Sequence, residues 1–140
     1  MTTPIFPCLW FDGQANEAAE YYCSVFPNSK ILSTNPIVSI LDLNGSRFMC
    51  LNGGPEFKFN ESVSFVVNCE NQEEIDHYWD EFSKEGVEGK CGWIKDKYGV
   101  SWQIVPSILG QLMSDPEKAP KVMYAFMQMK KFDIAKLLNA

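Results

Sequence analysis

The sequence has little of the material from which metal sites and disulfide frameworks are built. It contains one histidine, His77, and its five cysteines form no C-x-x-C pair. A zinc site would depend mostly on thiolates, and none of these is spaced as a local zinc knuckle. An odd number of cysteines, with no signal peptide before them, also argues against a disulfide framework. We therefore expect most of the cysteines to be small buried side chains.

Positive charge and long apolar runs are scarce as well. Twelve Lys and Arg residues stand against 18 Asp and Glu residues, which gives a net charge of −6. This balance disfavours nucleic-acid backbones and anionic lipids, and no basic stripe offsets it locally. No apolar run reaches the roughly 18 residues of a membrane span, and the proline-broken N-terminus does not read as a signal peptide. We expect a soluble, cytoplasmic protein that binds neither nucleic acid nor membrane.

Apolar and aromatic residues are plentiful and fall into short periodic segments. Hydrophobic residues make up 46% of the chain and aromatic residues 14%, enough for one domain or for two small modules that share a core. Alternating apolar residues predict strands, and apolar residues recurring every three or four positions predict helices. The expected strands are 6–11, 30–34, 38–43, 47–52 and 62–69, the expected helices are 14–26 and 71–85, and further helices follow residue 106.

The stretch 91–106 predicts a β-hairpin with its turn at Asp96 to Gly99. Asp accepts hydrogen bonds from nearby backbone, and Gly adopts a positive φ without a Cβ clash. After the turn, alternation places two sets of residues on opposite faces of a strand: Val100, Trp102 and Ile104, and Ser101, Gln103 and Val105. Gln103 is interpreted either as an amide in a pocket wall or as a solvent-facing residue of an edge strand.

An internal repeat relates the two halves of the chain. A shift of 56 residues places the first expected helix on the second, so that Tyr22 meets Tyr78. Near the module ends a shift of 54 pairs Phe48 with Trp102. Each half then reads as strand, helix and two or three strands. In isolation, each half would leave one apolar face of its sheet exposed to water, so we expect the two halves to pack against each other.

Three motifs resemble those of a known family: LWFDGQA (9–15), LNGGPEFKFN (51–60), and CGW (91–93) with SWQIVP (101–106). The family is the PhnB-like branch of the vicinal oxygen chelate superfamily, which includes glyoxalase I and bleomycin-resistance proteins; the branch is often labelled 3-demethylubiquinone methyltransferase. The resemblance implies an α+β fold of two βαβββ modules forming a curved mixed sheet around a cleft, with C-terminal helices. The expected single domain, 1–140, has module 1 at about 1–55, module 2 at about 60–107 and a helical extension at 108–140.

The resemblance also indicates where metal-dependent members hold their ion. Two ligands come from each module, and the matching positions here are Cys8, Met49, Ser64 and Gln103. Divalent ions prefer carboxylate, imidazole or thiolate ligands. This set supplies one soft ligand and no carboxylate, so we expect no metal. No glycine-rich strand-to-helix turn is present to hold a nucleotide-like methyl donor, so we also expect no cofactor.

Cys8 is the one candidate nucleophile. A catalytic thiol needs a base or a positive charge that lowers its pKa, and the sequence shows no Cys–His pairing. The alternative is a buried, inert thiol.

Two functional hypotheses follow. The first is a metal-free homodimer, either plain or domain-swapped, whose clefts bind a small, partly planar organic ligand. The second is a superfamily enzyme, a lyase, dioxygenase or group transferase, with unusual or no metal. A third interpretation is that the aromatics only fill the core. The ligand-binding residues of the first hypothesis are Cys8, Trp10, Met49, Ser64, Trp93, Trp102 and Gln103.

Overall fold

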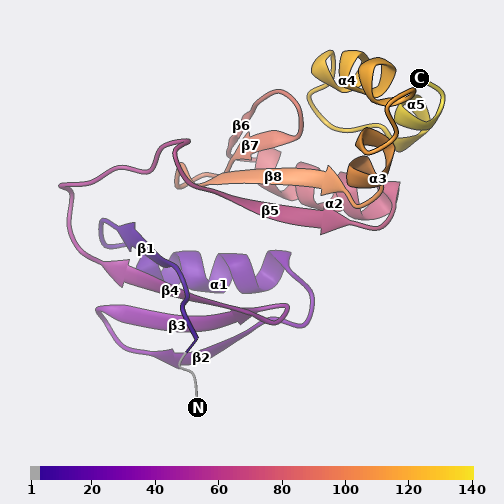
Figure 1. Cartoon of the computed structure of the whole chain (residues 1–140). Helices are drawn as coiled ribbons and strands as arrows, with labels where there is room; N and C mark the ends of the chain where they lie inside the picture. The colour runs from indigo at the N-terminus through magenta and orange to yellow at the C-terminus, as the bar shows by residue number, and fades with distance from the viewer. Residues whose placement is uncertain (1–3) are drawn as a thin grey trace. The chain divides into compact units, whose positions relative to one another are not determined.

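The computed structural model describes residues 4–140, and its chain divides into two compact units, Met1–Lys58 and Phe59–Ala140 (Figure 1). Each unit contains one four-stranded mixed sheet and one long helix packed on it. The strand orders are β1-β4-β3-β2 and β5-β8-β7-β6, so the second unit repeats the topology of the first. The predicted α+β class and the repeat of two βαβββ modules are confirmed.

The first unit places a parallel pair of strands at one side of its sheet and an antiparallel meander beside it. Small residues on α1, among them Ala15, Ala18 and Ala19, are fully buried and let the helix lie close to the sheet. Leu41 and Cys50 are buried on the facing strands. The elements are β1 (Cys8–Phe11), α1 (Ala15–Val25), β2 (Lys30–Thr34), β3 (Val38–Leu43) and β4 (Ser46–Asn52).

The second unit builds the same sheet with larger core side chains. Trp102 stacks on Phe82 of α2, with ring centroids 5.1 Å apart, and is 2% exposed. Its indole Nε1 donates to Asp96 Oδ2 at 2.9 Å. The elements are β5 (Ser64–Cys69), α2 (Gln72–Ser83), β6 (Val87–Glu88), β7 (Trp93–Lys95) and β8 (Ser101–Pro106).

The predicted hairpin turn is present and is organised by Asp96. Its Oδ1 accepts from the backbone N–H groups of Tyr98 and Val100 at 2.9 and 3.1 Å. Gly99 has a φ of +90°, a conformation that glycine adopts without steric cost. The short strand β6 was not predicted, because two residues carry no readable alternation.

Three helices follow the second sheet: α3 (Leu109–Met113), α4 (Ala119–Met127) and α5 (Ile134–Leu138). Phe132, between α4 and α5, is buried and lies against Gly92, where an added Cβ would come within 2.5 Å of its ring. The backbone N–H groups of Cys91 and Gly92 donate to the carbonyls of Met129 and Lys130 at 2.9 Å. The C-terminal helices are therefore attached to the hairpin by side-chain packing and by backbone hydrogen bonds.

No helix among residues 4–140 combines the length and the apolar character that crossing a membrane requires.

Candidate functional site

Each sheet has one face covered by its helix and one face that carries the predicted site residues. On β8 the buried Trp102 and Ile104 point toward α2, and Gln103 points to the other side. We call that other side the second open face. Strand register places Ser64 of β5 beside Ser101, and Trp93 of β7 beside Gln103. The second open face thus brings together residues that are far apart in the sequence.

Ser64 and Gln103 are hydrogen-bonded to each other on this face. The Gln103 Nε2 atom donates to Ser64 Oγ at 2.9 Å, and both side chains are half-buried. The parallel pairing of β5 with β8 brings them together across 39 positions of sequence. Two neutral polar groups of this kind can orient a ligand by hydrogen bonding.

Cys8 and Met49 occupy the equivalent positions of the first sheet. They are register partners on the parallel strands β1 and β4. Cys8 is exposed, so the alternative of a buried thiol is wrong, and only Cys50 and Cys69 of the five cysteines are buried. Partial burial of the Cys8 thiol still raises its pKa above its ordinary value. Because the thiolate is the reactive species, this shift lowers the reactivity of Cys8 at neutral pH.

Trp10 lies over the glycines of the LNGGPEFKFN motif. Its indole Nε1 donates to the Gly54 carbonyl at 2.9 Å, and its ring meets Phe57 edge-on at 5.0 Å. A Cβ on Gly53 would come within 2.4 Å of the indole. Asn52 of the same motif accepts from the Ala15 backbone N–H, at the start of α1, at 2.8 Å. Asn52, Gly53, Gly54 and Phe57 of this motif therefore have structural roles: they hold Trp10 in place and cap a helix.

The two other tryptophans of the predicted ligand-binding set have different surroundings. Trp102 lies in the core between the sheet and α2, and Phe65 and Phe82 contact it. Alternation along the strand had already placed Trp102 and Gln103 on opposite faces, so the two side chains do not line one cleft. We therefore leave Trp102 out of the proposed site. Trp93 is half-buried and lines a cavity of about 170 Å³.

That cavity includes four polar residues that sequence reasoning missed: Glu61, Glu88, Lys95 and Ser101. Lys95 and Ser101 are cross-strand partners on β7 and β8, and Glu61 pairs with Lys95, with Nζ and Oε1 2.8 Å apart. The hydrogen bond and the charge of Lys95 lower the pKa of the Glu61 carboxyl. The alternation of residues along the strand had placed Ser101 on the same face as Gln103. The position of Lys95 beside Ser101 follows only from the register between β7 and β8. The cavity is lined by Glu61, Val87, Glu88, Gly89, Trp93, Ile94, Lys95 and Ser101.

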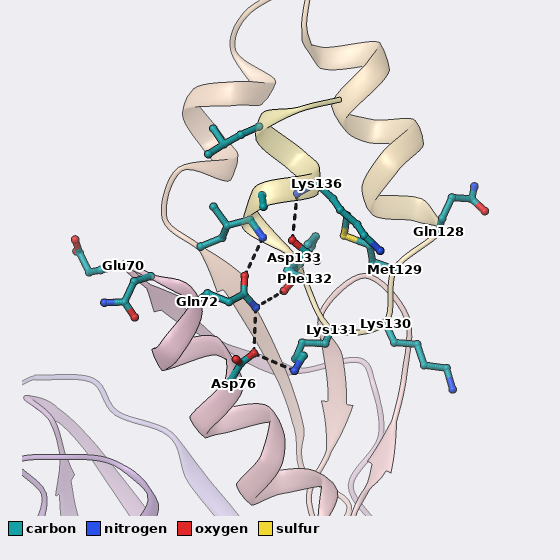
Figure 2. Close-up of a pocket in the computed structure, with 14 residues that line it drawn as sticks. Glu70, Gln72, Asp76, Gln128, Met129, Lys130, Lys131, Phe132, Asp133 and Lys136 are labelled. Atoms are coloured by element: carbon teal, nitrogen blue, oxygen red, sulfur yellow. Dashed lines mark hydrogen bonds and ion pairs between the residues drawn. The ribbon is translucent and has the colours of Figure 1, made fainter.

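A larger, open pocket of about 830 Å³ lies between the start of α2 and the C-terminal helices (Figure 2). Gln72 is at its centre: its Nε2 donates to the Phe132 carbonyl at 2.9 Å, and its Oε1 accepts from the Ile134 N–H at 2.9 Å. Lys131 and Asp76 form an ion pair at 2.9 Å beside it. These groups are used in holding the C-terminal helices to α2, so we treat this pocket as a structural junction.

The four residues that the family resemblance matches to metal-ligand positions, Cys8, Met49, Ser64 and Gln103, do not suit a divalent ion. Ser64 and Gln103 are neutral and bonded to each other, Met49 is a thioether, and the pKa of Cys8 is raised. Among residues 4–140 no group of three or more His, Cys, Asp or Glu side chains is placed to hold an ion. Binding to a neutral hydroxyl or amide group does not compensate a divalent cation for the water molecules that it must lose. We therefore derive no chemical step through a metal.

A protein-family model described as 3-demethylubiquinone-9 3-methyltransferase matches residues 3–105. A PhnB protein from Bacillus cereus, whose structure carries the same family description, is 32% identical; the match covers 75% of this chain and 100% of that one, with a TM-score of 0.69. No curated protein matches the sequence.

Two further solved structures share the fold. Protein PA1353 from Pseudomonas aeruginosa is 17% identical over 75% of this chain and 98% of its own, with a TM-score of 0.61. A glyoxalase-related enzyme from Fulvimarina pelagi is 13% identical over 76% and 89%, with a TM-score of 0.56. The family match ends at residue 105, so the C-terminal helices lie beyond it.

Proposed function

The chain belongs to the 3-demethylubiquinone-9 3-methyltransferase family of PhnB-like, glyoxalase-related proteins, and from this premise we propose that it is a metal-free binder of a small, partly planar organic ligand. The observation that carries the proposal is the Ser64–Gln103 hydrogen bond. At positions where metal-dependent relatives hold an ion, this chain carries a neutral donor–acceptor pair. Trp93 stands beside it as an aromatic wall.

The polar pair and the aromatic wall have complementary roles in this proposal. Gln103 and Ser64 hydrogen-bond to a polar substituent of the ligand, and Trp93 packs on its planar part. Met49 and Cys8, on the first sheet, offer polarisable apolar surface to the same class of ligand. Trp10 contributes through its exposed edge only, since Gly53 and Phe57 hold its ring.

The alternative is an enzyme, and the family description is the observation that favours it. A methyltransferase needs a methyl donor, and such nucleotide-like donors are held by a glycine-rich turn between a strand and a helix. Here β5 passes to α2 through Glu70 and Asn71, and β1 passes to α1 through a turn with one glycine, Gly13. These turns do not fit the donor, so no transfer step is derived.

Native mass spectrometry of the purified protein, with elemental analysis of the same sample, tests the binder against the enzyme. We expect a bound organic mass, or fragment binding that Gln103→Ala weakens about tenfold, because an orienting hydrogen bond is lost. Gln111→Ala, on exposed α3, is the matched control. Stoichiometric metal whose binding Gln103→Ala abolishes would favour the enzyme instead.

We propose further that the protein is a homodimer. Tyr124 and Met127 of α4 are 74% and 58% exposed, and Phe57 is 63% exposed. A second copy that covers such apolar side chains would remove them from water. Light scattering should report twice 15.9 kDa, and Tyr124→Lys combined with Met127→Lys should shift the mass to the monomer. A wild-type monomer at micromolar concentration would contradict the dimer.

The five free thiols are compatible with a reducing compartment, and we propose that the protein acts in the cytoplasm. Cell fractionation with an antibody tests this assignment.

A further inference from the structure

A row of side chains crosses the second open face from one edge of the sheet to the other. Register makes Ser64, Ser101, Lys95 and Val87 successive cross-strand neighbours on β5, β8, β7 and β6. Three of these four line the cavity of about 170 Å³, which also includes Trp93. The cavity therefore lies directly beside the Ser64–Gln103 pair.

Ser101 is the unusual member of this row. Its side chain is on the face of the cavity, the residue is 1% exposed, and its Oγ atom has no hydrogen-bond partner among the described residues. A buried hydroxyl without a partner destabilises the folded state, because the hydrogen bonds it made to water in the unfolded chain are not replaced. Such groups call for an explanation, and a polar group that enters the cavity and pairs with Ser101 supplies one.

Lys95 provides the positive charge at the same place, beside two carboxylates of the lining, Glu61 and Glu88. An ammonium group has three N–H donors, and Glu61 accepts from it at 2.8 Å. Glu61 lies on the loop before β5 and its side chain is 62% exposed. An ion pair this exposed contributes little net free energy, so an anion that enters the cavity can share Lys95 with Glu61 or displace it.

The size and walls of the cavity limit the rest of the ligand. A volume of about 170 Å³ is close to that of an engineered cavity that holds one benzene molecule, about 150 Å³. Trp93 supplies a planar wall and Val87 an apolar one. Lys95 and Ser101 are cross-strand neighbours, and the ammonium and the hydroxyl are both able to donate hydrogen bonds to a ligand.

We infer that this cavity binds the carboxylate end of a small, single-ring organic acid, with Lys95 and Ser101 as its donors and Trp93 against its ring. The inference rests on the proposed function and specifies the ligand class of the same face. The net charge of −6 alone would favour a cationic or neutral guest, and two carboxylates, Glu61 and Glu88, also line the cavity. Glu88 already accepts from the Trp79 indole Nε1 at 2.6 Å, so the inference depends on Lys95 and Ser101 as the donors that face the ligand.

The experiment compares three probes of one size in titrations followed by amide NMR: benzoate, benzamide and benzylamine. We expect benzoate to bind most tightly and to shift the amides of β7 and β8. Lys95→Met should weaken benzoate at least tenfold, since a charge-assisted hydrogen bond is lost. Ser101→Ala should weaken it about threefold to tenfold. Glu61→Gln should strengthen it about twofold to fivefold by removing a competitor for Lys95.

Lys97→Met is the matched control, because Lys97 also pairs with a glutamate, Glu85, and does not line the cavity. It should leave benzoate binding unchanged. Ser101→Ala should keep the thermal stability of the wild type or raise it, which separates a ligand-binding hydroxyl from a structural one.

Two results would overturn the inference. If benzamide or benzylamine binds on β7 and β8 as tightly as benzoate, the carboxylate assignment is wrong, while the proposed binder function stands. If none of the three shifts these amides, the cavity is not a ligand site; the proposed function is then judged by the Gln103→Ala experiment alone.

Discussion

The two units have the same strand order and carry different chemistry at equivalent positions. Where the first sheet pairs Cys8 with Met49, the second pairs Ser64 with Gln103 through a hydrogen bond. The row that continues from Ser64 adds a buried hydroxyl and Lys95. A repeated scaffold thus leaves a polarisable, mostly apolar face on one unit and a hydrogen-bonding face on the other.

The units also begin their helices differently. Helix α2 is capped locally, because Asn71 accepts from the Glu74 N–H at 2.9 Å. Helix α1 has no side-chain cap from Gln14; the cap comes from Asn52 at the end of β4, which also donates to the Pro36 carbonyl at 3.0 Å. The N-terminal cap of α1 therefore depends on tertiary structure, whereas the cap of α2 is supplied by the residue directly before the helix.

The largest expected effect is loss of the aromatic core of the second unit. Trp102→Ala should lower the free energy of unfolding by about 3–5 kcal/mol. Its repeat partner Phe48 is also buried, and Phe48→Ala should cost less, because Trp102 additionally donates to the buried Asp96 carboxylate. Urea unfolding measures both. An equal cost would show that the indole hydrogen bond contributes nothing.

The next largest expected difference between the two units is the loss of stability caused by substituting a glycine in each. Gly92 has a φ of +82°, and a Cβ there would approach the Ile104 carbonyl oxygen within 2.7 Å as well as Phe132. Gly92→Ala should cost about 2–5 kcal/mol, combining backbone strain with overpacking. Gly45→Ala, at a φ of +97° with open space around it, should cost only about 1–2 kcal/mol. Thermal unfolding compares them; a similar loss in both would mean that the C-terminal helices do not pack tightly on Gly92.

The two helix caps provide a smaller comparison. Asn71→Ala should cost about 1 kcal/mol, as expected for a local cap. Asn52→Ala should cost up to about 2 kcal/mol, because it removes the cap of α1 and the bond to Pro36 together. Hydrogen exchange of the Ala15 amide should accelerate only in the Asn52 variant. No change there would contradict the remote cap.

The smallest expected effect is a change in stability that appears only at alkaline pH. Burial raises the pKa of Cys50 and of Cys69 to about 12, one thiol in each unit. In the unfolded chain a thiol loses its proton near pH 9, so the unfolded state is favoured as the pH rises from about 9 to 12. In each of the variants Cys50→Ala and Cys69→Ala, the free energy of unfolding should fall less steeply with pH above pH 9 than in the wild type. Below pH 8 its dependence on pH should be the same as in the wild type. Unfolding midpoints across pH 7–11 test this, and an unchanged slope above pH 9 would show that these thiols are not protected.

The sequence by itself determined the order of elements, the internal repeat, the Asp96–Gly99 turn and the family. These features depend on local chemistry: alternation, three-and-four spacing and turn residues act over a few positions. The tertiary structure decided which face of each strand a helix covers, and so it assigned Trp102 to the core and Gln103 to the open face. It also brought Glu61, Lys95 and Ser101 together, because register between strands depends on pairing across the sheet and not on the spacing within any one segment.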